Sequence, residues 1–254
     1  MSDVSSEGPA TAAGGERARA PNVDSAEIAK FESLAETWWD PHGKFKPLHD
    51  INPLRLNFID ERAGLRGKRV VDVGCGGGIL SEAMARRGAH VLGIDMADAP
   101  LAVARIHQRD HGGELALEYQ RETAEELAER EAGTFDAVTC LEVLEHVPDP
   151  ASTIAACARL VRPGGDVFFA TINRNPKSFV FAIVGAEYVL RLLPRGTHQY
   201  SKFIRPSEMR EWAAAAGLDL RGLIGMTYNP FTRAYRLGPD SSVNYLAHYG
   251  RLKG

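Results

Sequence analysis

The sequence predicts an α/β fold with a mostly parallel sheet and helices on both of its faces. Three observations predict it. Short apolar runs typical of buried strands alternate with segments of helical length from residue 68 to residue 173. The first run ends in a cluster of glycines, and the second ends in an acid, Asp95. Glycines and an acid at the ends of neighbouring parallel strands are typical of sheets that bind a nucleotide.

The composition is that of an ordinary soluble protein. The chain has 254 residues, enough for one large domain, with 44% hydrophobic and 25% charged residues. Its net charge of −3 does not indicate a surface that grips phosphates, so we expect no nucleic-acid partner. The three cysteines, Cys75, Cys140 and Cys157, form no C-x-x-C pair, which favours a reducing cytoplasm over a disulfide framework.

The sequence predicts one domain with a tail before it and an insertion inside it. Residues 1–24 contain no aromatic residue and are rich in Ala, Gly, Ser and Glu, which predicts a disordered tail. Residues 25–254 are expected to form a single domain. The alternation of strands and helices stops after Asn173, so residues 174–205 are expected to be an insertion in that domain.

Two helices are predicted before the first strand, within residues 25–66. An apolar stripe at helical spacing indicates the first helix, and Asp24 followed by Glu27 resembles a capping box at its start. The second helix is expected to begin with Asn52 as its N-cap and Pro53 at its first position.

Seven strands are predicted by short apolar runs bounded by glycines and polar residues. Their expected ranges are 68–74, 89–95, 115–120, 135–143, 164–173, 218–225 and a last strand within 229–238. Helices are expected at 77–88, 98–111, 123–131, 151–161 and 207–217. Strands separated by helices of this length predict a parallel arrangement.

The insertion contains the most apolar stretch of the chain, from Ser178 to Leu193. It is shorter than the ~20 residues that a bilayer-spanning helix needs, and it contains Glu187 and Arg191. Its basic edges are typical of a helix lying in a membrane interface, whereas a lid over the substrate site fits the same pattern equally well. We therefore expect residues 178–195 to contact an anionic membrane surface, to cover the site, or to do both.

A glycine-rich turn, GCGGG, follows the first strand at residues 74–78. Glycines there allow the backbone to approach a ligand, and the helix N-terminus that follows favours groups that accept hydrogen bonds. The dinucleotide fingerprint requires G-x-G-x-x-G, but Ile79 stands at its last position, which favours a nucleotide without a pyrophosphate. Asp95 has the acceptor oxygens to bind the hydroxyls of a ribose.

Three side chains that can carry chemistry follow the fourth strand: Glu142, Glu145 and His146. Their offsets are those that place side chains on one face of a helical turn, roughly 5–6 Å apart. Two carboxylates and an imidazole can hold a metal ion, act as acid and base, or cap a helix. The residues alone leave these three roles open.

The motifs VVDVGCGGG, GIDM and LVRPGG resemble those of class I S-adenosylmethionine-dependent methyltransferases. The resemblance implies a Rossmann-like sheet of seven strands, mostly parallel with the last strand antiparallel, and S-adenosylmethionine as cofactor. Longer segments, among them EIAKFESLAETWWDPHGKFKPLHDINPLRLNFI and TCLEVLEHVPDP, narrow it to the bacterial ubiquinone-biosynthesis O-methyltransferases. This narrower resemblance runs from about Val23 to about Tyr249.

The resemblance implies roles for individual residues. Those implied to contact S-adenosylmethionine are Arg55, Gly74, Gly76, Asp95, Met96 and Leu141. The N-terminal helices would form a lid that brings Arg55 to the methionyl carboxylate. Glu142, Glu145 and His146 are implied to hold a divalent metal, Mg²⁺ or a first-row transition ion, with Glu142 and His146 in catalysis. His49 is a weaker candidate for a general base.

The function implied is O-methylation of ring hydroxyls on polyprenylated phenol or catechol intermediates, at both such steps of ubiquinone biosynthesis. The partners implied are this substrate, anionic lipid and other enzymes of the pathway. The location implied is the cytoplasm, at the inner face of the cytoplasmic membrane. Two alternatives remain: a metal-dependent small-RNA terminal 2′-O-methyltransferase and another small-molecule O-methyltransferase. The acidic charge balance and the lack of a basic stripe count against the RNA enzyme.

Overall fold

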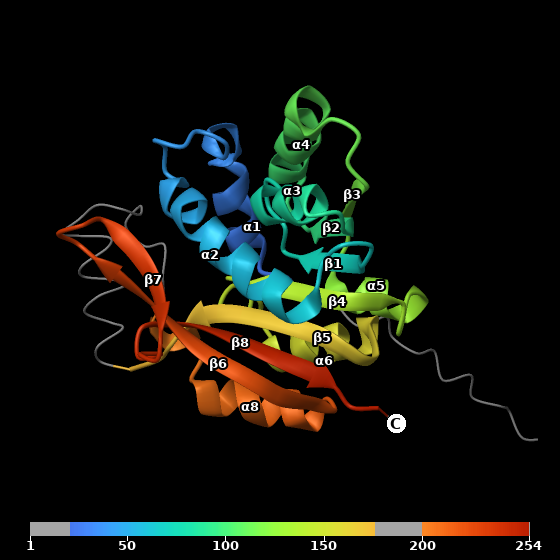
Figure 1. Ribbon diagram of the computed structural model, residues 1–254. Coiled ribbons are helices and arrows are strands. Elements are labelled where there is room, and N and C mark those ends of the chain that lie inside the picture. The colour runs from blue at the N-terminus through green and yellow to red at the C-terminus, as the bar shows by residue number, and fades with distance from the viewer. Residues whose placement is uncertain (1–20, 176–199, 254) are drawn as a thin grey trace, which may run out of the picture.

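The computed structural model describes residues 21–175 and 200–253, in which helices cover both faces of a mixed sheet (Figure 1). Most of the predicted tail and the apolar segment 178–195 lie outside the described residues. Within the two described ranges, no helix has the length and apolar character required to cross a membrane.

Across the two described ranges, the sheet has eight strands in the order β3-β2-β1-β4-β5-β8-β6-β7. Neighbouring strands from β3 to β5 run parallel, whereas β8 lies between β5 and β6 and is antiparallel to both. The bounds are β1 Arg69–Val73, β2 His90–Asp95, β3 Leu117–Arg121, β4 Phe135–Leu141, β5 Val161–Ile172, β6 Leu218–Asn229, β7 Ala234–Gly238 and β8 Asn244–Arg251. The predicted Rossmann-like class is therefore confirmed, with one strand more than predicted.

The strand β8 was not predicted, and the last strand was expected within residues 229–238 instead. That segment ends in the short strand β7, which pairs with β6 at the edge of the sheet as described. Six consecutive residues of β8 are buried, so the strand lacks the alternation of apolar and polar residues by which a half-buried strand is recognised. Glycine and histidine within this buried run weaken the apolar signal further.

The helices divide between the two faces of the sheet, as Figure 1 shows. One face is covered by α2, α3 and α4, and the other by α5, α6 and α8, each group packed in its own hydrophobic cluster. Their bounds are α1 Ser25–Glu32, α2 Lys46–Ala63, α3 Ile79–Arg86, α4 Asp98–His107, α5 Ala124–Arg130, α6 Pro150–Leu160 and α8 Pro206–Ala215.

The strands at the centre of the sheet are buried on both faces because helices cover both. Val70 and Val71 of β1 are fully buried, yet they belong to clusters on opposite sides of the sheet. Phe168 and Phe169 of β5 likewise belong to clusters on opposite sides of the sheet. Successive side chains of a strand point to opposite faces, so each central strand must be apolar throughout.

The N-terminal segment differs from the prediction in where its helices begin and end. The helix α1 ends at Glu32, and the rest of the predicted apolar stripe lies in a turn and a 3-10 helix, η1 (Ala35–Thr37). The helix α2 begins at Lys46, so Asn52 and Pro53 are inside it rather than at its start. A second proline, at position 47, stands in the first turn of α2, which is where proline is tolerated.

Residues 21–24, predicted as part of the tail, pack against the domain. The amide of Asn22 donates to Glu125 Oε1 at 3.0 Å and to Thr153 Oγ1 at 3.1 Å, and its own oxygen accepts from the backbone of Asp149 at 2.9 Å. These bonds connect the start of α1 to α5 and α6. They fix the position from which α1 reaches the site.

Candidate active site

All nine predicted site residues line one cavity of about 930 Å³ at the carboxyl ends of β1, β2 and β4. They are Arg55, Gly74, Gly76, Asp95, Met96, Leu141, Glu142, Glu145 and His146. The cavity lies where the order of strands reverses, between β1 and β4, which is the place where sheets of this type bind ligands. Its volume is at the upper end of the roughly 300–1,000 Å³ common for ligand sites.

The glycine turn is tied to the end of β2 through Asp95. Gly74 donates its backbone N–H to Ile94 O at 2.8 Å, and Gly76 donates to Asp95 Oδ2 at 2.8 Å. The other oxygen of Asp95 accepts from Ala97 N at 2.8 Å, and burial raises the pKa of this carboxyl. Asp95 therefore joins the two strand–helix junctions that face the cavity.

Two of the glycines are required by packing against the lid. A Cβ atom on Gly76 or on Gly77 would lie 2.3 Å from the ring of Trp38, well inside contact distance. The Trp38 ring is itself stacked on Phe45, with ring centroids 4.0 Å apart. Close approach of a ligand was the reason expected for these glycines, and for Gly76 and Gly77 the structure adds packing against Trp38.

A second tryptophan of the lid, Trp39, also contacts the glycine turn. The indole N–H of Trp39 donates to Gly77 O at 2.8 Å, and its ring stacks on His107 of α4 with centroids 3.4 Å apart. His107 contacts the buried carboxylate of Glu82 through Nδ1 at 2.7 Å. The predicted lid is thus held onto both the glycine turn and α4.

The lid does not present His49 to the site. Its Nε2 lies 2.9 Å from the carbonyl oxygen of Trp38, and His49 is not among the residues that line the cavity. This placement does not suit His49 for the role of general base, for which the sequence made it a candidate.

Asp72, at the end of β1, lines the cavity and was not singled out from the sequence. Its carboxylate accepts from Ser81 Oγ at 2.6 Å and from Thr139 Oγ1 at 2.7 Å. Burial raises the pKa of Asp72 to about 6. An acid inside a buried apolar run was the signal that could have identified it.

The turn after β4 differs from the helical turn expected there. Glu142 has a φ of 56°, a left-handed conformation that is uncommon for a residue with a side chain, and its N–H donates to Ala170 O at 2.9 Å. The Glu142 carboxylate forms an ion pair with Arg55 of α2, whose side chain is 7% exposed. The Nε atom of Arg55 is buried and has no hydrogen-bond partner in the described part of the chain.

Glu145 is buried within the same turn. Its Oε2 accepts from Thr171 Oγ1 of β5 at 2.9 Å, whereas Oε1 has no hydrogen-bond partner among the residues that the structure describes. Burial, reinforced by the neighbouring Glu142, raises the pKa of Glu145 well above its ordinary value. An acceptor left unpartnered in a buried position calls for a proton or a cation.

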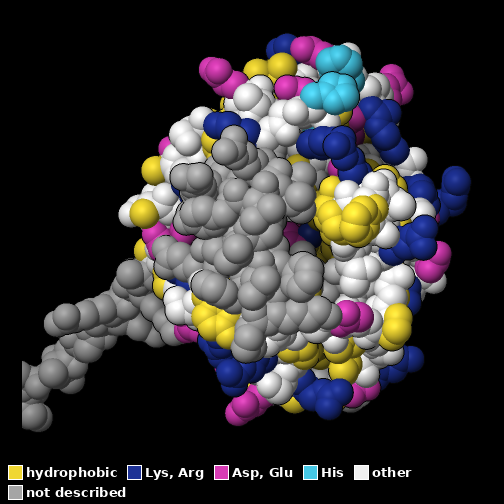
Figure 2. Space-filling model, turned by 90° about the vertical axis from the view of Figure 1, so that its left-hand side faces the viewer, with side chains coloured by type: hydrophobic (Ala, Val, Ile, Leu, Met, Phe, Trp, Pro, Cys, Tyr) yellow, Lys and Arg dark blue, Asp and Glu magenta, His cyan; other side chains and the backbone are white. Residues whose placement is uncertain are grey.

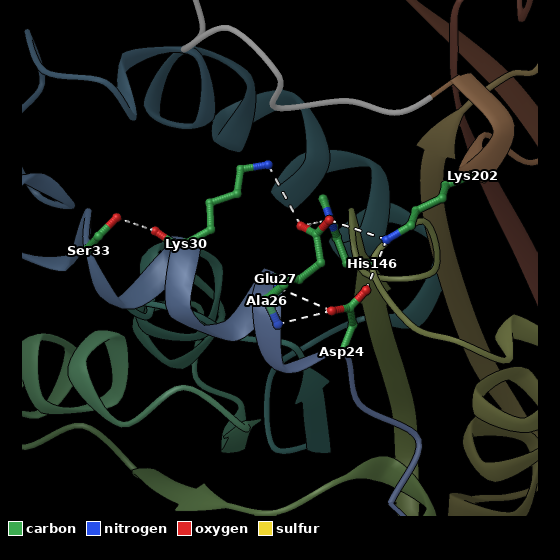
Figure 3. Close-up of polar contacts among 7 residues, drawn as sticks. All are labelled: Asp24, Ala26, Glu27, Lys30, Ser33, His146 and Lys202. Carbon is green, nitrogen blue, oxygen red and sulfur yellow. Dashed lines mark hydrogen bonds and ion pairs between the residues drawn. The ribbon is translucent and has the colours of Figure 1, made fainter.

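His146 is oriented by Glu27, a residue whose role the sequence analysis missed (Figure 3). The Nδ1 atom of His146 lies 3.0 Å from Glu27 Oε2, and Lys30 and Lys202 contact the same carboxylate. The hydrogen bond from His146 lowers the pKa of Glu27 to about 2.

The predicted capping box at the start of α1 is only half formed. The Asp24 side chain accepts from the backbone N–H groups of Ala26 and Glu27, but Glu27 does not reach back to Asp24. Its side chain extends toward His146 instead, from α1 to the turn after β4, as Figure 3 shows. Only the tertiary structure shows this pairing, because 119 positions separate the two residues.

The side chains of Glu142, Glu145 and His146 are chemically suited to bind a metal ion, but their arrangement suits one only in part. The unpartnered oxygen of Glu145 lies in the turn that also carries Glu142, and His146 has the carboxylate partner on Nδ1 that metal-bound histidines usually have. However, the side chains turn to three different partners, and within the described ranges no group of three metal-binding residues is arranged to hold an ion.

The fold and this cavity define the class, which is that of the class I methyltransferases. The glycine turn and Asp95 form one side of the cavity, and the turn from Glu142 to His146 forms the other. A family model described as "Methyltransferase domain" matches residues 48–222. Among solved structures, magnesium protoporphyrin IX methyltransferase from Synechocystis with bound SAH is similar, with a TM-score of 0.66 and 17% identity over 89% of this chain and 99% of that one.

The same fold serves other reactions. The [4+2]-cyclase SpnF is also similar, with a TM-score of 0.60 and 18% identity over 80% of this chain and 81% of that one. Likeness at this level therefore establishes the fold and leaves the chemistry to the residues of the site.

Curated relatives are far more similar in sequence. The ubiquinone biosynthesis O-methyltransferase of Hahella chejuensis is 67% identical over 89% of this chain and 94% of its own length. That of Pseudomonas aeruginosa (strain UCBPP-PA14) is 65% identical over 91% of this chain and 98% of its own length. The chain belongs to the ubiquinone biosynthesis O-methyltransferase family.

Proposed function

We propose that the protein is an S-adenosylmethionine-dependent O-methyltransferase that methylates ring hydroxyls of polyprenylated phenol or catechol intermediates, at both O-methylation steps of ubiquinone biosynthesis. The observation that carries the proposal is that the glycine turn, Asp95, Arg55 and the turn with Glu142 and His146 all open into one cavity. A cofactor held by the first group would present its methyl group toward the second.

The cofactor is proposed to contact Gly74, Gly76, Asp95, Met96, Leu141 and Arg55. Asp95 would accept from the ribose hydroxyls while it keeps its bonds to the glycine turn. Arg55 is suited to the methionyl carboxylate because it is buried and its Nε has no partner among the described residues. Arg55 already pairs with Glu142, so it would connect the cofactor to the catalytic turn.

The chemical step is a displacement at the sulfonium methyl group. The substrate oxygen forms a bond to the methyl carbon, the carbon–sulfur bond breaks, and S-adenosylhomocysteine leaves with the electron pair on sulfur. A phenol with a pKa near 10 attacks slowly until its proton is removed. His146 is proposed to accept this proton at Nε2, because Glu27 faces its Nδ1 and thereby fixes the orientation of the ring.

A divalent metal held by Glu142, Glu145 and His146 is proposed as the alternative to His146 acting as a base. Such an ion would lower the pKa of a catechol-like hydroxyl and orient its oxygen. Two observations support a cation there: Oε1 of Glu145 has no partner in the described ranges, and His146 pairs with Glu27.

Peripheral association with the cytoplasmic face of the membrane is part of the proposal, with residues 178–195 and other enzymes of the pathway as candidate contacts. The reason is chemical: a polyprenyl tail keeps the substrate in the bilayer, so its ring must be reached from the membrane surface.

Methyl transfer to a short-chain demethylubiquinol and to a matching catechol, with and without EDTA, tests the proposal. Transfer to both substrates is expected. Activity lost with EDTA and restored by one divalent ion would assign the Glu142 turn to a metal, and activity indifferent to EDTA would assign proton removal to His146. No transfer to either substrate, with S-adenosylmethionine bound, would contradict the proposed function.

A further inference from the structure

The tip of the β6–β7 hairpin presents the most exposed large apolar side chain in the described part of the chain. Phe231 is 96% exposed, compared with 59% for Leu252, the next in rank. The tip is held in shape by Asn229, whose Oδ1 accepts from Phe231 N at 2.9 Å and from Thr232 N at 3.2 Å. The turn therefore keeps the Phe231 ring exposed to water. Burial of the ring against a partner would remove the unfavourable free energy of that exposure.

The charged side chains of the hairpin itself are of one sign. From Leu220 to Pro239 the chain contains no aspartate or glutamate, although the whole protein has a net charge of −3. Arg233 and Arg236 are exposed, and neither guanidinium has an ion pair or hydrogen bond to another described residue. In Figure 2, which faces this side of the molecule, hydrophobic side chains are bordered by Lys and Arg side chains.

The hairpin is also a wall of the cavity. Tyr228, Pro230 and Tyr235 line the cavity, and Phe231 directly follows Pro230 at the tip. Tyr228 and Tyr235 lie opposite each other on β6 and β7, with ring centroids 4.7 Å apart. The hairpin thus runs from the site to a tip with an aromatic ring and two arginines, the pattern of a segment that enters a membrane interface.

We infer that the hairpin tip, Asn229 to Arg236, docks on an anionic lipid bilayer, with Phe231 inserted among the acyl chains and Arg233 and Arg236 at the headgroups. When the hairpin is docked in this way, the cavity wall that it forms lies next to the membrane surface. A substrate whose tail remains in the bilayer can then place its ring in the cavity, a consequence that rests on the proposed function. The docking surface itself does not depend on that function.

The test uses the full chain with a single environment-sensitive label at the tip. All three native cysteines are buried, so a Phe231→Cys variant can be labelled with the fluorophore NBD at that one exposed position. A blue shift of NBD emission is expected on mixing with phosphatidylglycerol-containing vesicles, and none is expected from the matched Leu252→Cys variant. In flotation, Phe231→Ser is expected to lower the fraction bound about tenfold. The double variant Arg233→Gln, Arg236→Gln is expected to bind more weakly at low salt and to be less sensitive to added salt than wild type.

Activity on a tail-less substrate separates this inference from the proposed function. Phe231→Ser is expected to keep wild-type methyl transfer to a short-chain quinol in solution. Three results would overturn the inference: no shift of the label at position 231 on anionic vesicles, the same shift produced by a soluble quinol alone, or vesicle binding that is lost only on charge reversal at Arg191 and Arg195. Loss of methyl transfer in every variant and in the wild type would contradict the proposed function and leave the vesicle result standing.

Discussion

The cavity has two walls that are built in different ways. The glycine wall, residues 73–97, consists of two consecutive strand–helix junctions joined by the bonds of Asp95. The carboxylate wall, Glu142 to His146, is one short turn whose side chains find partners on three other elements. Arg55 is 87 positions away from its partner in the sequence, and Glu27 is 119 positions away from its own.

This difference shows two ways in which a fold can hold side chains at a cavity. In the glycine wall, local turns and a buried strand end fix the shape, so the wall depends on the backbone. In the carboxylate wall, the positions of the carboxylates and the imidazole depend on side chains carried by the N-terminal lid and by β5. The carboxylate wall should therefore be more sensitive to changes far from it in the sequence.

The largest expected effect is on catalysis at the carboxylate wall. His146→Gln should lower kcat by about 100- to 10,000-fold because it removes either the base or a ligand, with cofactor affinity unchanged. Steady-state kinetics and calorimetric binding of S-adenosylhomocysteine would measure the two effects. The exposed His90 supplies the matched control, His90→Gln, which should behave as wild type. Wild-type kcat in His146→Gln would remove His146 from the mechanism.

The next effect tests the connection between the lid and the carboxylate wall. Arg55→Met leaves Glu142 without its partner and should lower the free energy of unfolding by about 3 kcal/mol. The double variant Arg55→Met, Glu142→Gln should recover most of this loss but not the affinity for S-adenosylmethionine. Urea denaturation and cofactor binding would be measured on the wild type, on Arg55→Met and on the double variant. Recovery of cofactor affinity in the double variant would contradict the role proposed for Arg55.

A third prediction concerns the glycine wall and the tryptophan above it. Gly77→Ala should lower the free energy of unfolding by about 2 kcal/mol, because the new Cβ would lie 2.3 Å from the Trp38 ring. Trp38→Leu should offset much of that cost when combined with Gly77→Ala, which a double-mutant cycle would report as a coupling energy. Purely additive effects would show that Gly77 is required for another reason.

The smallest expected effect is the dependence of stability on pH through Glu27. Its pKa is lowered from 4.5 to about 2, so its stabilising contribution is complete above pH 4.5 and is lost as the pH falls toward 2. The Glu27–His146 pair is partly exposed, and partial screening by solvent weakens it, so Glu27→Gln should cost only about 1 kcal/mol at pH 7. The difference from wild type should shrink by pH 3, as followed by urea denaturation at both pH values. A constant difference would indicate that Glu27 acts through packing.

The sequence predicted the glycine wall more fully than the carboxylate wall. The glycines and Asp95 follow predicted strands directly, and local patterns are sufficient to place them on one edge of a parallel sheet. The three residues of the carboxylate wall were also found, but their expected helical arrangement was wrong because Glu142 takes a left-handed conformation. Glu27 was interpreted as a capping residue, since its contact with His146 has no local signal.

The sequence by itself determined the class of fold, the ends of the strands that form the site, and which residues can carry chemistry there. These properties depend on hydrophobic periodicity and on residue type, both of which are local. Only the tertiary structure decided that β8 lies inside the sheet, that Trp38 requires two of the glycines, and that Glu27 and Arg55 pair with His146 and Glu142. Each of these depends on contacts between distant segments, which form only when the whole chain packs.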